Sequence, residues 1–498
     1  MKEYNFYYDE SEHSRKINYK TITADNHYDN FIAVVIGWHS QNETDLLRNY
    51  AAFEEKYQHR QSNGELKSTT IRQDQLKSGF ASLNRDNTCL LEDFLALFDD
   101  RTLIYYSVIS KMEYIIRQLF EDYENSFLVD MDAVKYSITK AIVLYQPMDI
   151  IEGLYENTGE LVALLKNFLS VQIEKDKANE SLKQKEIEQF SQILMILDDV
   201  STIRTIDWNY DISFVGFKKY LAEKTIENYL LTIDNEGGKG NTAKAAARVG
   251  LCAVSAADSL TSFGIRMADM LAGVISKLLK ALHNSLHYTS SAEQVSKKIL
   301  DNSWFVINER QLILYKKMHN VAVEINKAWY KAFAGTYSDD LIVLIAFLGF
   351  MNNFESAESI KINIDMQGEH FNAYACDILA NYYKRMRNKL PIDIVSNTSK
   401  EYFLNQRGAK IYFDIKKQPL LKISNGQRIC NVLSIGISKE MIPTVTVAET
   451  NEAKCYRLPM ELSEWAITLV GCANMGTNIF PAKVVFSKTE GGYYADIL

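Results

Sequence analysis

Residues 4–11 read Tyr-Asn-Phe-Tyr-Tyr-Asp-Glu-Ser, an aromatic run followed by two carboxylates and a serine. Aromatic residues favour β-structure, so this run predicts a first strand with Asp9 close to its end. The next apolar run, residues 31–37 (FIAVVIG), shows no alternation with polar residues. Such continuous apolar character indicates a strand that is buried on both faces of a sheet. An α/β fold is therefore the first prediction.

The rest of the sheet and its helices follow along the chain. Three further apolar runs complete a set of five predicted strands: Leu103–Ser110, Tyr229–Asp234 and Cys252–Ala256. Between Ser262 and His283 the apolar residues recur with helical spacing, which predicts a helix with one face on the core. Helices placed between strands are typical of a sheet covered on its faces.

Composition changes along the chain predict three parts. Residues 1–290 hold the predicted strands, with a helical insert at about 112–200, and residues 291–390 are helical in pattern. Residues 391–498 are richer in short strands and turns, and we expect a β-rich C-terminal domain with strands at 410–414, 443–448 and 482–487. Because proline disfavours helix in the residue before it, a helix is expected to end at or before Leu390.

The totals limit the possible classes of protein. The chain has 498 residues and a net charge of −8, so it carries no overall basic surface for nucleic acid. Its 6 cysteines form no Cys-x-x-Cys pair, which fits a reducing compartment and disfavours structural zinc. The run Leu341–Met351 is too short to cross a membrane, and no signal peptide is visible, so a cytoplasmic protein is expected.

Acidic residues recur where the predicted strands end. Asp9 closes the first strand, Asp234 closes the fourth, and Asp258 follows the fifth. Asp269 lies among apolar residues of the predicted helix, where a carboxylate has to be half-buried and paired or at the edge of the apolar face. Hard cations such as Mg²⁺ prefer carboxylate oxygens from separate elements, so these residues are candidate metal ligands. For Asp258, capping the helix that follows is an equally good interpretation.

Several segments together resemble a bacterial family known as domain of unknown function 3800. Asp9-Glu10-Ser11 resembles its Asp-Glu-Ser-Gly opening, and Asp258-Ser259 followed by residues 264–273 (GIRMADMLAG) resembles its closing signature. Three intermediate segments are similar in the same order: Glu65-Leu66-Lys67, Ser107 to Lys111, and Leu231 to Asp234. The resemblance covers about residues 1–290, with Glu12 where the family usually has Gly and Arg266 where it has Gln.

This resemblance implies a ribonuclease-H-like fold and a suspected nuclease. Some members are encoded near mobile elements or phage-defence systems, so a phage-defence effector is the implied role. On this interpretation the chain hydrolyses phosphodiester bonds in DNA or RNA with Mg²⁺ or Mn²⁺ in a two-metal site. Asp9, Asp234 and Asp269 are the expected metal ligands, and Glu65 and Asp258 are further catalytic candidates.

Lysines near these carboxylates are candidate contacts to the phosphate backbone. Lys67 and Lys111 lie in the segments that resemble the family, although a solvated lysine is the commoner explanation for either. The segment 235–250 (NEGGKGNTAKAAARVG) is expected to be a mobile loop, in which Lys239 could reach nucleic acid. It lacks the Gly-x-x-x-x-Gly-Lys pattern of a phosphate-binding loop.

The alternative is a protein without catalysis. It would keep the nuclease fold as a scaffold and bind a partner, or a second copy of itself, through the helical insert and residues 391–498. Convergence of the carboxylates would favour the nuclease, whereas lysines that fill the crevice between them would favour the scaffold. The 8 histidines are dispersed and no Gly-x-Ser-x-Gly motif occurs, so Ser/His catalysis and a histidine-rich metal site are not expected.

Overall fold

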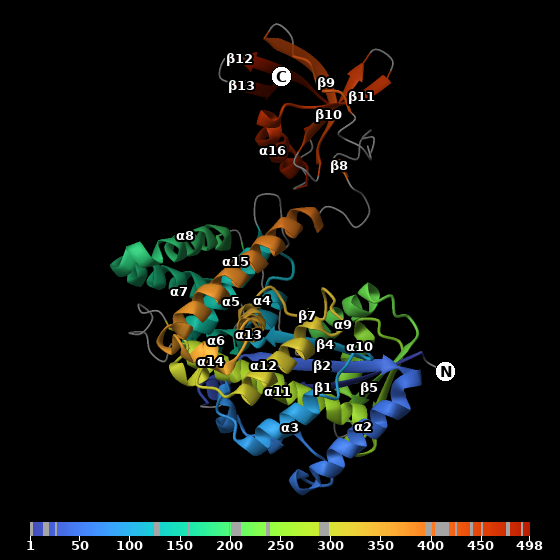
Figure 1. Cartoon of the computed structure of the whole chain (residues 1–498). Helices are drawn as coiled ribbons and strands as arrows, with labels where there is room; N and C mark the ends of the chain where they lie inside the picture. Colours follow the sequence, from blue (N-terminus) through green and yellow to red (C-terminus); the bar gives the residue numbers. More distant parts are fainter. Residues whose placement is uncertain are drawn as a thin grey trace. The chain divides into compact units, whose positions relative to one another are not determined.

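The computed structural model confirms an α/β protein with a mixed six-stranded sheet and a separate antiparallel C-terminal sheet (Figure 1). It describes residues 3–12, 19–24, 27–123, 130–156, 160–198, 200, 211–235, 240–287, 298–393, 401–403, 418–423, 426–438, 442–449, 452–474, 479–489 and 492–498. Two compact units divide the chain: residues 1–121 with 134–380, and residues 122–133 with 381–498. In the described residues, no helix is long and apolar enough to cross a membrane.

The mixed sheet of the first unit contains all five predicted strands. Its strand order is β6-β5-β1-β2-β4-β7. The bounds are β1 Tyr4–Ser11, β2 Asn30–His39, β4 Thr102–Ser110, β5 Tyr229–Asp234, β6 Val254–Ala257 and β7 Ala332–Phe333. Strand β2 is antiparallel to both β1 and β4, whereas β5 runs parallel to β1 and β6 parallel to β5. Strands β1, β5 and β6 therefore end at the same edge.

Helices cover both faces of this sheet. One face carries α11 (Phe263–Leu286), α12 (Glu309–His319) and α13 (Asp339–Asn352) with α2 (Glu43–Lys56) and α3 (Arg85–Leu95). The other carries α9 (Asp211–Glu223) and α10 (Asn241–Arg248). Both faces of β2 are buried in these cores, as its continuous apolar sequence predicted. We call the first of these faces the α11 face.

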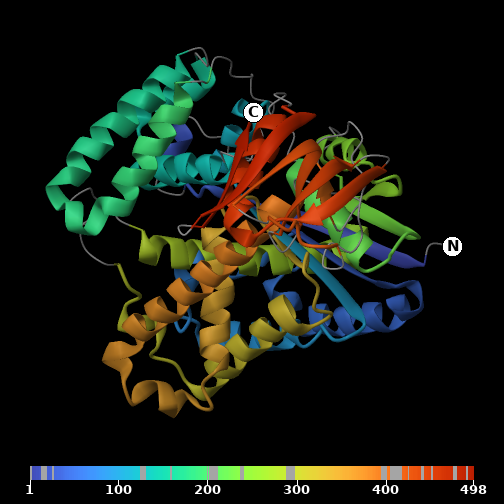
Figure 2. The ribbon, with the colours of Figure 1, turned by 90° about the horizontal axis from the view of Figure 1, so that it is seen from above.

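Shorter elements and a long insert complete the unit. After β4 and α4 (Lys111–Leu119) come α5 (Met131–Tyr145), α6 (Met148–Glu156), α7 (Leu161–Asp176) and α8 (Glu180–Leu197), and α7 packs on α8 as a hairpin (Figure 2). The remaining elements are α1 (Tyr19–Ile22), β3 (Lys77–Phe80), α14 (Ala357–Lys361) and α15 (Gln367–Asp393), of which the residues from 381 belong to the second unit. The helical insert expected at about 112–200 is present.

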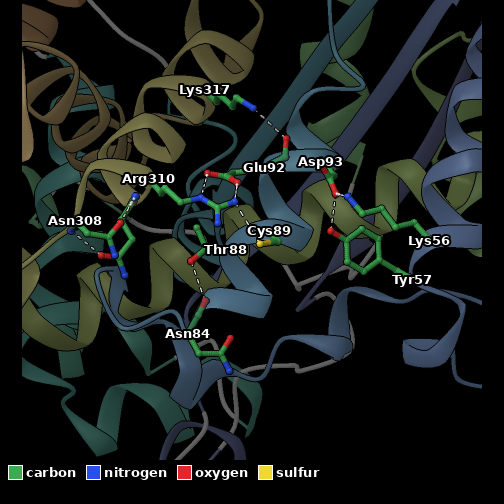
Figure 3. A network of polar contacts seen from close by, with 11 residues as sticks. Lys56, Tyr57, Asn84, Thr88, Cys89, Glu92, Asp93, Asn308, Arg310 and Lys317 are labelled. Carbon is green, nitrogen blue, oxygen red and sulfur yellow. Dashed lines mark hydrogen bonds and ion pairs between the residues drawn. The ribbon is translucent and has the colours of Figure 1, made fainter.

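A polar network joins two helices on the α11 face (Figure 3). The guanidinium of Arg310 on α12 pairs with the carboxylate of Glu92 on α3, and the ammonium of Lys317 donates to the Glu92 carbonyl at 3.3 Å. Beside it, Asp93 accepts from the hydroxyl of Tyr57 at 2.6 Å and pairs with Lys56. The network fixes the packing of α3 at the periphery of the core.

The second unit contains the C-terminal sheet. Its strands follow the order β11-β10-β9-β12-β13, and β8 also pairs with β9. The bounds are β8 Glu401–Phe403, β9 Gln427–Ser438, β10 Pro443–Glu449, β11 Glu452–Arg457, β12 Ala482–Thr489 and β13 Gly492–Ile497, with α16 (Ser463–Asn474) packed on the sheet. The strands predicted at 443–448 and 482–487 are confirmed, and that at 410–414 lies outside the described residues.

Two expectations from the sequence are wrong, and one strand was not predicted. Helix α15 includes Pro391 and continues to Asp393, so the preference of the residue before proline did not end the helix at Leu390. Part of the expected loop at 235–250 is instead the helix α10, whose Ala245 and Ala246 are buried. Strand β7 was not anticipated; it is only 2 residues long, too short to give a pattern.

Candidate functional site

Asp9 points toward the α11 face at the end of β1. Side chains alternate along a strand, and Tyr7 belongs to the core of the α11 face while Tyr8 belongs to the opposite core. Asp9 therefore shares the face of Tyr7, in agreement with its pairing with Val34, which also lies in the α11-face core. One Asp9 carboxylate oxygen accepts from the Glu10 backbone N–H at 2.7 Å.

Asp234 lies at the end of the neighbouring strand and on the same face. Leu231 and Ile233 pack into the opposite core, so alternation places Asp234 toward α11. Tyr8 is paired with Ile233 in the parallel register, which puts Asp9 and Asp234 at the same level of the sheet. The register therefore places Asp9 and Asp234 on neighbouring strands, at the same end of the sheet and on the same face.

Asp258 follows β6, the third parallel strand that ends at this edge. Its carboxylate accepts from the Leu260 N–H at 2.9 Å and caps the short 3-10 helix Ser259–Thr261. The capping interpretation of Asp258 therefore describes its contacts in this structure. The charge of Asp258 also affects the carboxylate of Asp234. Burial, then the negative charges of Asp258 and Glu65, raise the pKa of Asp234.

Glu65 is buried and held by two partners. Its side chain accepts from the Ser259 hydroxyl at 2.7 Å, and its other oxygen lies 3.0 Å from the Lys67 ammonium. The hydrogen bond that Lys67 donates to Glu65 raises the pKa of Lys67, and the charges of Glu65, Asp269 and Asp234 act in the same direction. The ammonium of Lys67 is therefore within electrostatic reach of three of the predicted carboxylates.

Asp269 enters the site from α11. Its two carboxylate oxygens accept from the backbone N–H and the hydroxyl of Ser68, at 2.9 and 3.0 Å. The helix and the segment that carries Ser68 approach closely, since a Cβ on Gly273 would lie 2.2 Å from the Ser68 Cβ. The half-buried Lys277 donates from its ammonium to the Ser68 carbonyl at 3.2 Å. Ser68 and Lys277 were missed by the sequence analysis, because an isolated serine or lysine gives no pattern.

The two departures from the family pattern have clear structural effects. Glu12 has φ 67°, a left-handed conformation that glycine adopts more readily, and its carboxylate pairs with Lys280 at 2.7 Å. Arg266 forms a bidentate pair with Glu54, with both distances 2.8 Å, and donates to the Ser259 carbonyl at 2.6 Å. Arg266 therefore fixes the turn that carries Asp258 and Ser259.

The predicted phosphate contacts have different outcomes. Lys67 has a side chain that is 49% exposed and lies beside the carboxylates. The prediction for Lys111 is wrong, since this residue is 1% exposed and its ammonium donates to the Tyr28 carbonyl at 2.8 Å. It satisfies a backbone group below the surface and cannot reach a ligand. Lys239 lies outside the described residues.

The donors fit a divalent cation in kind but are not gathered around one position. Carboxylate oxygens suit Mg²⁺ or Mn²⁺. Burial and, after it, repulsion by Asp258 and Glu65 raise the pKa of Asp234, and a cation would offset both effects. In the described part of the chain, however, no group of three or more His, Cys, Asp or Glu side chains has a metal-binding arrangement. Glu65 and Asp269 are instead held by Ser259 and Ser68. Metal binding would require these side chains to rotate.

Comparisons with known proteins give no match: no family model, no curated protein and no solved structure matches this chain. The resemblance to the domain of unknown function 3800 family stays a prediction.

Proposed function

We propose that the edge formed by β1, β5 and β6 is the active site of a nuclease that uses Mg²⁺ or Mn²⁺. The observation that carries the proposal is the register of this sheet, in which two neighbouring parallel strands carry Asp9 near the end of β1 and Asp234 at the end of β5, both on the face covered by α11. The helix adds Asp269, and Glu65 and Asp258 lie near enough to affect Asp234 or Lys67. Three antiparallel strands followed by two parallel ones also agree with a ribonuclease-H-like sheet.

Each side chain has a defined part in this proposal. Asp9, Asp234 and Asp269 would hold the cations, and a bound pair of divalent cations stabilises the attacking and leaving oxygens of a phosphodiester. Ser68 and Ser259 hold the carboxylates of Asp269 and Glu65 in the metal-free protein, and these hydrogen bonds would be released when a cation binds. Lys67 is the group best placed to contact a phosphate, because it is partly exposed and has positive charge at the same edge. DNA and RNA are both candidate substrates, and phage defence is the candidate setting.

One observation favours the second candidate, a scaffold without catalysis. The ammonium of Lys67 pairs with Glu65, and the ammonium of Lys277 lies in the same neighbourhood beneath Asp269. Two lysines can neutralise the carboxylates without a metal, which would leave a stable but inert edge. In that case the protein would act through a bound protein partner or a second copy of itself.

A cleavage assay separates the two functions. The full chain is incubated with single- and double-stranded DNA, RNA and an RNA–DNA hybrid, with Mg²⁺ or Mn²⁺ and with chelator. We expect metal-dependent cleavage that Asp9→Asn abolishes. Asp74→Asn, which changes an exposed carboxylate paired with Arg72, is the matched control and should stay active. Absence of cleavage together with absence of any metal-induced change in melting temperature would establish the scaffold instead.

A further inference from the structure

A cavity lies beside the C-terminal half of α11, away from the carboxylate edge. It has a volume of about 190 Å³, and all of its lining residues belong to the first unit. Much of the wall is aliphatic and comes from the helices α5, α11, α13 and α15. The aliphatic lining residues are Leu144, Leu279, Leu282, Leu286, Val343 and Leu379. We call this hollow the histidine cavity, because His283 and His287 also line it.

The charged side chains that line the histidine cavity are paired with one another. The ammonium of Lys140 donates to Asp339 at 3.0 Å, and the Nδ1 of His283 lies 3.0 Å from a carboxylate oxygen of Asp340. Burial opposes charge on His283, but Asp340 outweighs it and raises the pKa of that ring above its ordinary value. Near pH 6.5 both pairs are therefore close to neutral, and among the lining residues no charge is left over for an ionic ligand.

Further contacts hold these pairs in place. Asp340 also accepts from the side-chain amide of Asn30 at 2.6 Å and from the hydroxyl of Tyr28 at 3.3 Å. Asp339 also accepts from the hydroxyl of Tyr136 at 3.2 Å. A ligand would have to break supported ion pairs in order to use either carboxylate.

His287 is the polar group of the cavity that stays available to a ligand. Its Nδ1 lies 3.1 Å from the His283 carbonyl, and because a carbonyl oxygen only accepts, Nδ1 carries the hydrogen and Nε2 the lone pair. Burial and, after it, the charge of His283 lower the pKa of His287 to about 4, so the ring is neutral. In the described part of the chain no side chain or backbone group donates to Nε2 of His287. This atom can therefore accept a hydrogen bond from a ligand.

We propose that the histidine cavity binds a small uncharged molecule with an aliphatic body and one hydrogen-bond donor, such as a hydroxyl group, that donates to Nε2 of His287. Contact of the aliphatic body with the leucines would supply most of the binding free energy. The volume is somewhat larger than the roughly 150 Å³ of a leucine-lined cavity that holds benzene in another protein, so about six to eight non-hydrogen atoms fit. An ionic ligand would lose its water without gaining a partner.

Three probes with the same six-carbon chain test this proposal on the full chain: 1-hexanol, hexanoate and hexylammonium. Binding is followed by the transfer of magnetisation from protein to probe in NMR spectra. We expect 1-hexanol to bind saturably with a Kd on the order of 1 mM. Each ion should bind at least about 10-fold more weakly, because its charge finds no partner in the cavity. Absence of saturable binding of 1-hexanol, or equal affinity for either ion, would overturn the proposal.

Two variants of α13 locate the binding. Val343→Phe places a ring in the cavity and should weaken the binding of 1-hexanol at least about 10-fold, because the free volume is lost. Ile345→Phe changes a half-buried residue of the same helix that does not line the cavity, and it should bind 1-hexanol as the unchanged protein does. Equal affinity in the two variants would show that 1-hexanol binds elsewhere and would overturn the proposal.

His287→Phe tests the polar contact, since it keeps an aromatic ring and removes Nε2. The affinity for 1-hexanol should fall by about 3- to 10-fold, as expected for the loss of one hydrogen bond. His370→Phe, at an exposed histidine of α15, is the matched control and should change nothing. Asp234→Asn should also bind 1-hexanol normally, which separates this result from the fate of the carboxylate edge. Equal affinity in His287→Phe and His370→Phe would overturn the assignment of Nε2 as the acceptor.

Discussion

The carboxylate edge and the histidine cavity lie on the same helix and differ in almost every other respect. Asp269 and His283 are fourteen residues apart on α11, which corresponds to about 21 Å along its axis. The edge collects oxygen donors from strands, loops and α11, and Lys67 pairs with one of them, Glu65. The cavity collects aliphatic side chains around two histidines of one helix, each already oriented through its Nδ1.

This difference shows what each site needs before it can bind a ligand. At the edge, Asp269 and Glu65 must give up hydrogen bonds from serines, so binding includes a rearrangement. In the cavity the tautomer of His287 is set by the His283 carbonyl, and the second ring is fixed by Asp340. We therefore expect a metal response at the edge that depends on counter-ions, and binding of an uncharged ligand in the cavity that depends on free volume and on Nε2 of His287.

The largest expected effect is the loss of the Mg²⁺ or Mn²⁺ response when a carboxylate at the end of β5 is replaced. Asp234→Asn should remove most of the rise in melting temperature that Mg²⁺ or Mn²⁺ produces, and lower metal-dependent cleavage on the order of 100-fold or more. Without metal, the variant should be as stable as the unchanged protein or slightly more so, because burial and neighbouring acids disfavour the Asp234 carboxylate. Thermal melts with and without each metal measure both effects, and a response to Mg²⁺ that survives Asp234→Asn would exclude this residue as a ligand.

A buried charge away from both sites gives the next effect. Lys331 is 2% exposed, its ammonium donates to the Ile325 carbonyl, and burial lowers its pKa to about 7. Between about pH 7 and the ordinary lysine pKa of about 10.4, the unfolded chain binds more protons than the folded one, so stability should rise with pH. The total gain is on the order of a few kcal/mol.

Lys331→Met should flatten this dependence, and melts at pH 7, 8 and 9.5 would measure it. Lys327→Met, at a largely exposed lysine, is the control and should keep the slope. Parallel curves for Lys331→Met and the unchanged protein would show that Lys331 is not the cause. The comparison shows whether burial of the Lys331 ammonium governs the pH dependence of stability above pH 7.

Much of the fold was predictable because its strands carry strong local patterns. The apolar run in β2 and the aromatic run in β1 gave their positions, and the chain order of the strands fitted one sheet. Strand β7 was not predictable, because two residues carry no periodicity. The end of α15 was misplaced, since a preference of the residue before Pro391 was treated as a boundary.

The candidate site was predictable only in part. Strand ends placed Asp9 and Asp234 at one edge, because parallel neighbours end together. The partners of the carboxylates could not be inferred: Ser68 is about 200 positions from Asp269 in the sequence, and their contact depends on how α11 packs. Burial of Lys111 was equally hidden, since its sequence context resembles an exposed strand end.

A smaller effect is expected from the counter-ion of the edge. Lys67→Met removes the ammonium that competes with a cation for Glu65, so Mg²⁺ affinity should rise by about 5-fold, equivalent to roughly 1 kcal/mol. The metal-free protein should melt at a lower temperature, because a buried carboxylate loses its partner. Lys56→Met, at a largely exposed lysine paired with Asp93, should change neither quantity appreciably.

The measurement for Lys67→Met is a Mg²⁺ titration followed by melting temperature, with a 1-hexanol titration as a second measurement. The affinity for 1-hexanol should be unchanged, because the histidine cavity contains neither Lys67 nor Glu65. A fall in Mg²⁺ affinity would mean that Lys67 assists binding, for example by orienting Glu65, and the contrast between a lysine-blocked edge and an open cavity would have to be abandoned.

The smallest effect is expected from Arg310, which belongs to neither site. Its guanidinium pairs with Glu92 across α12 and α3, and its side chain is 48% exposed (Figure 3). Water and salt screen such a pair, so Arg310→Gln should shift the melting temperature by at most about 2 °C. The responses to Mg²⁺ and 1-hexanol should both stay as they are, because α3 contributes no residue to either site. A loss of either response in Arg310→Gln, with the protein still folded, would show that the packing of α3 and α12 supports α11 at a distance, and the two sites could then no longer be treated as independent.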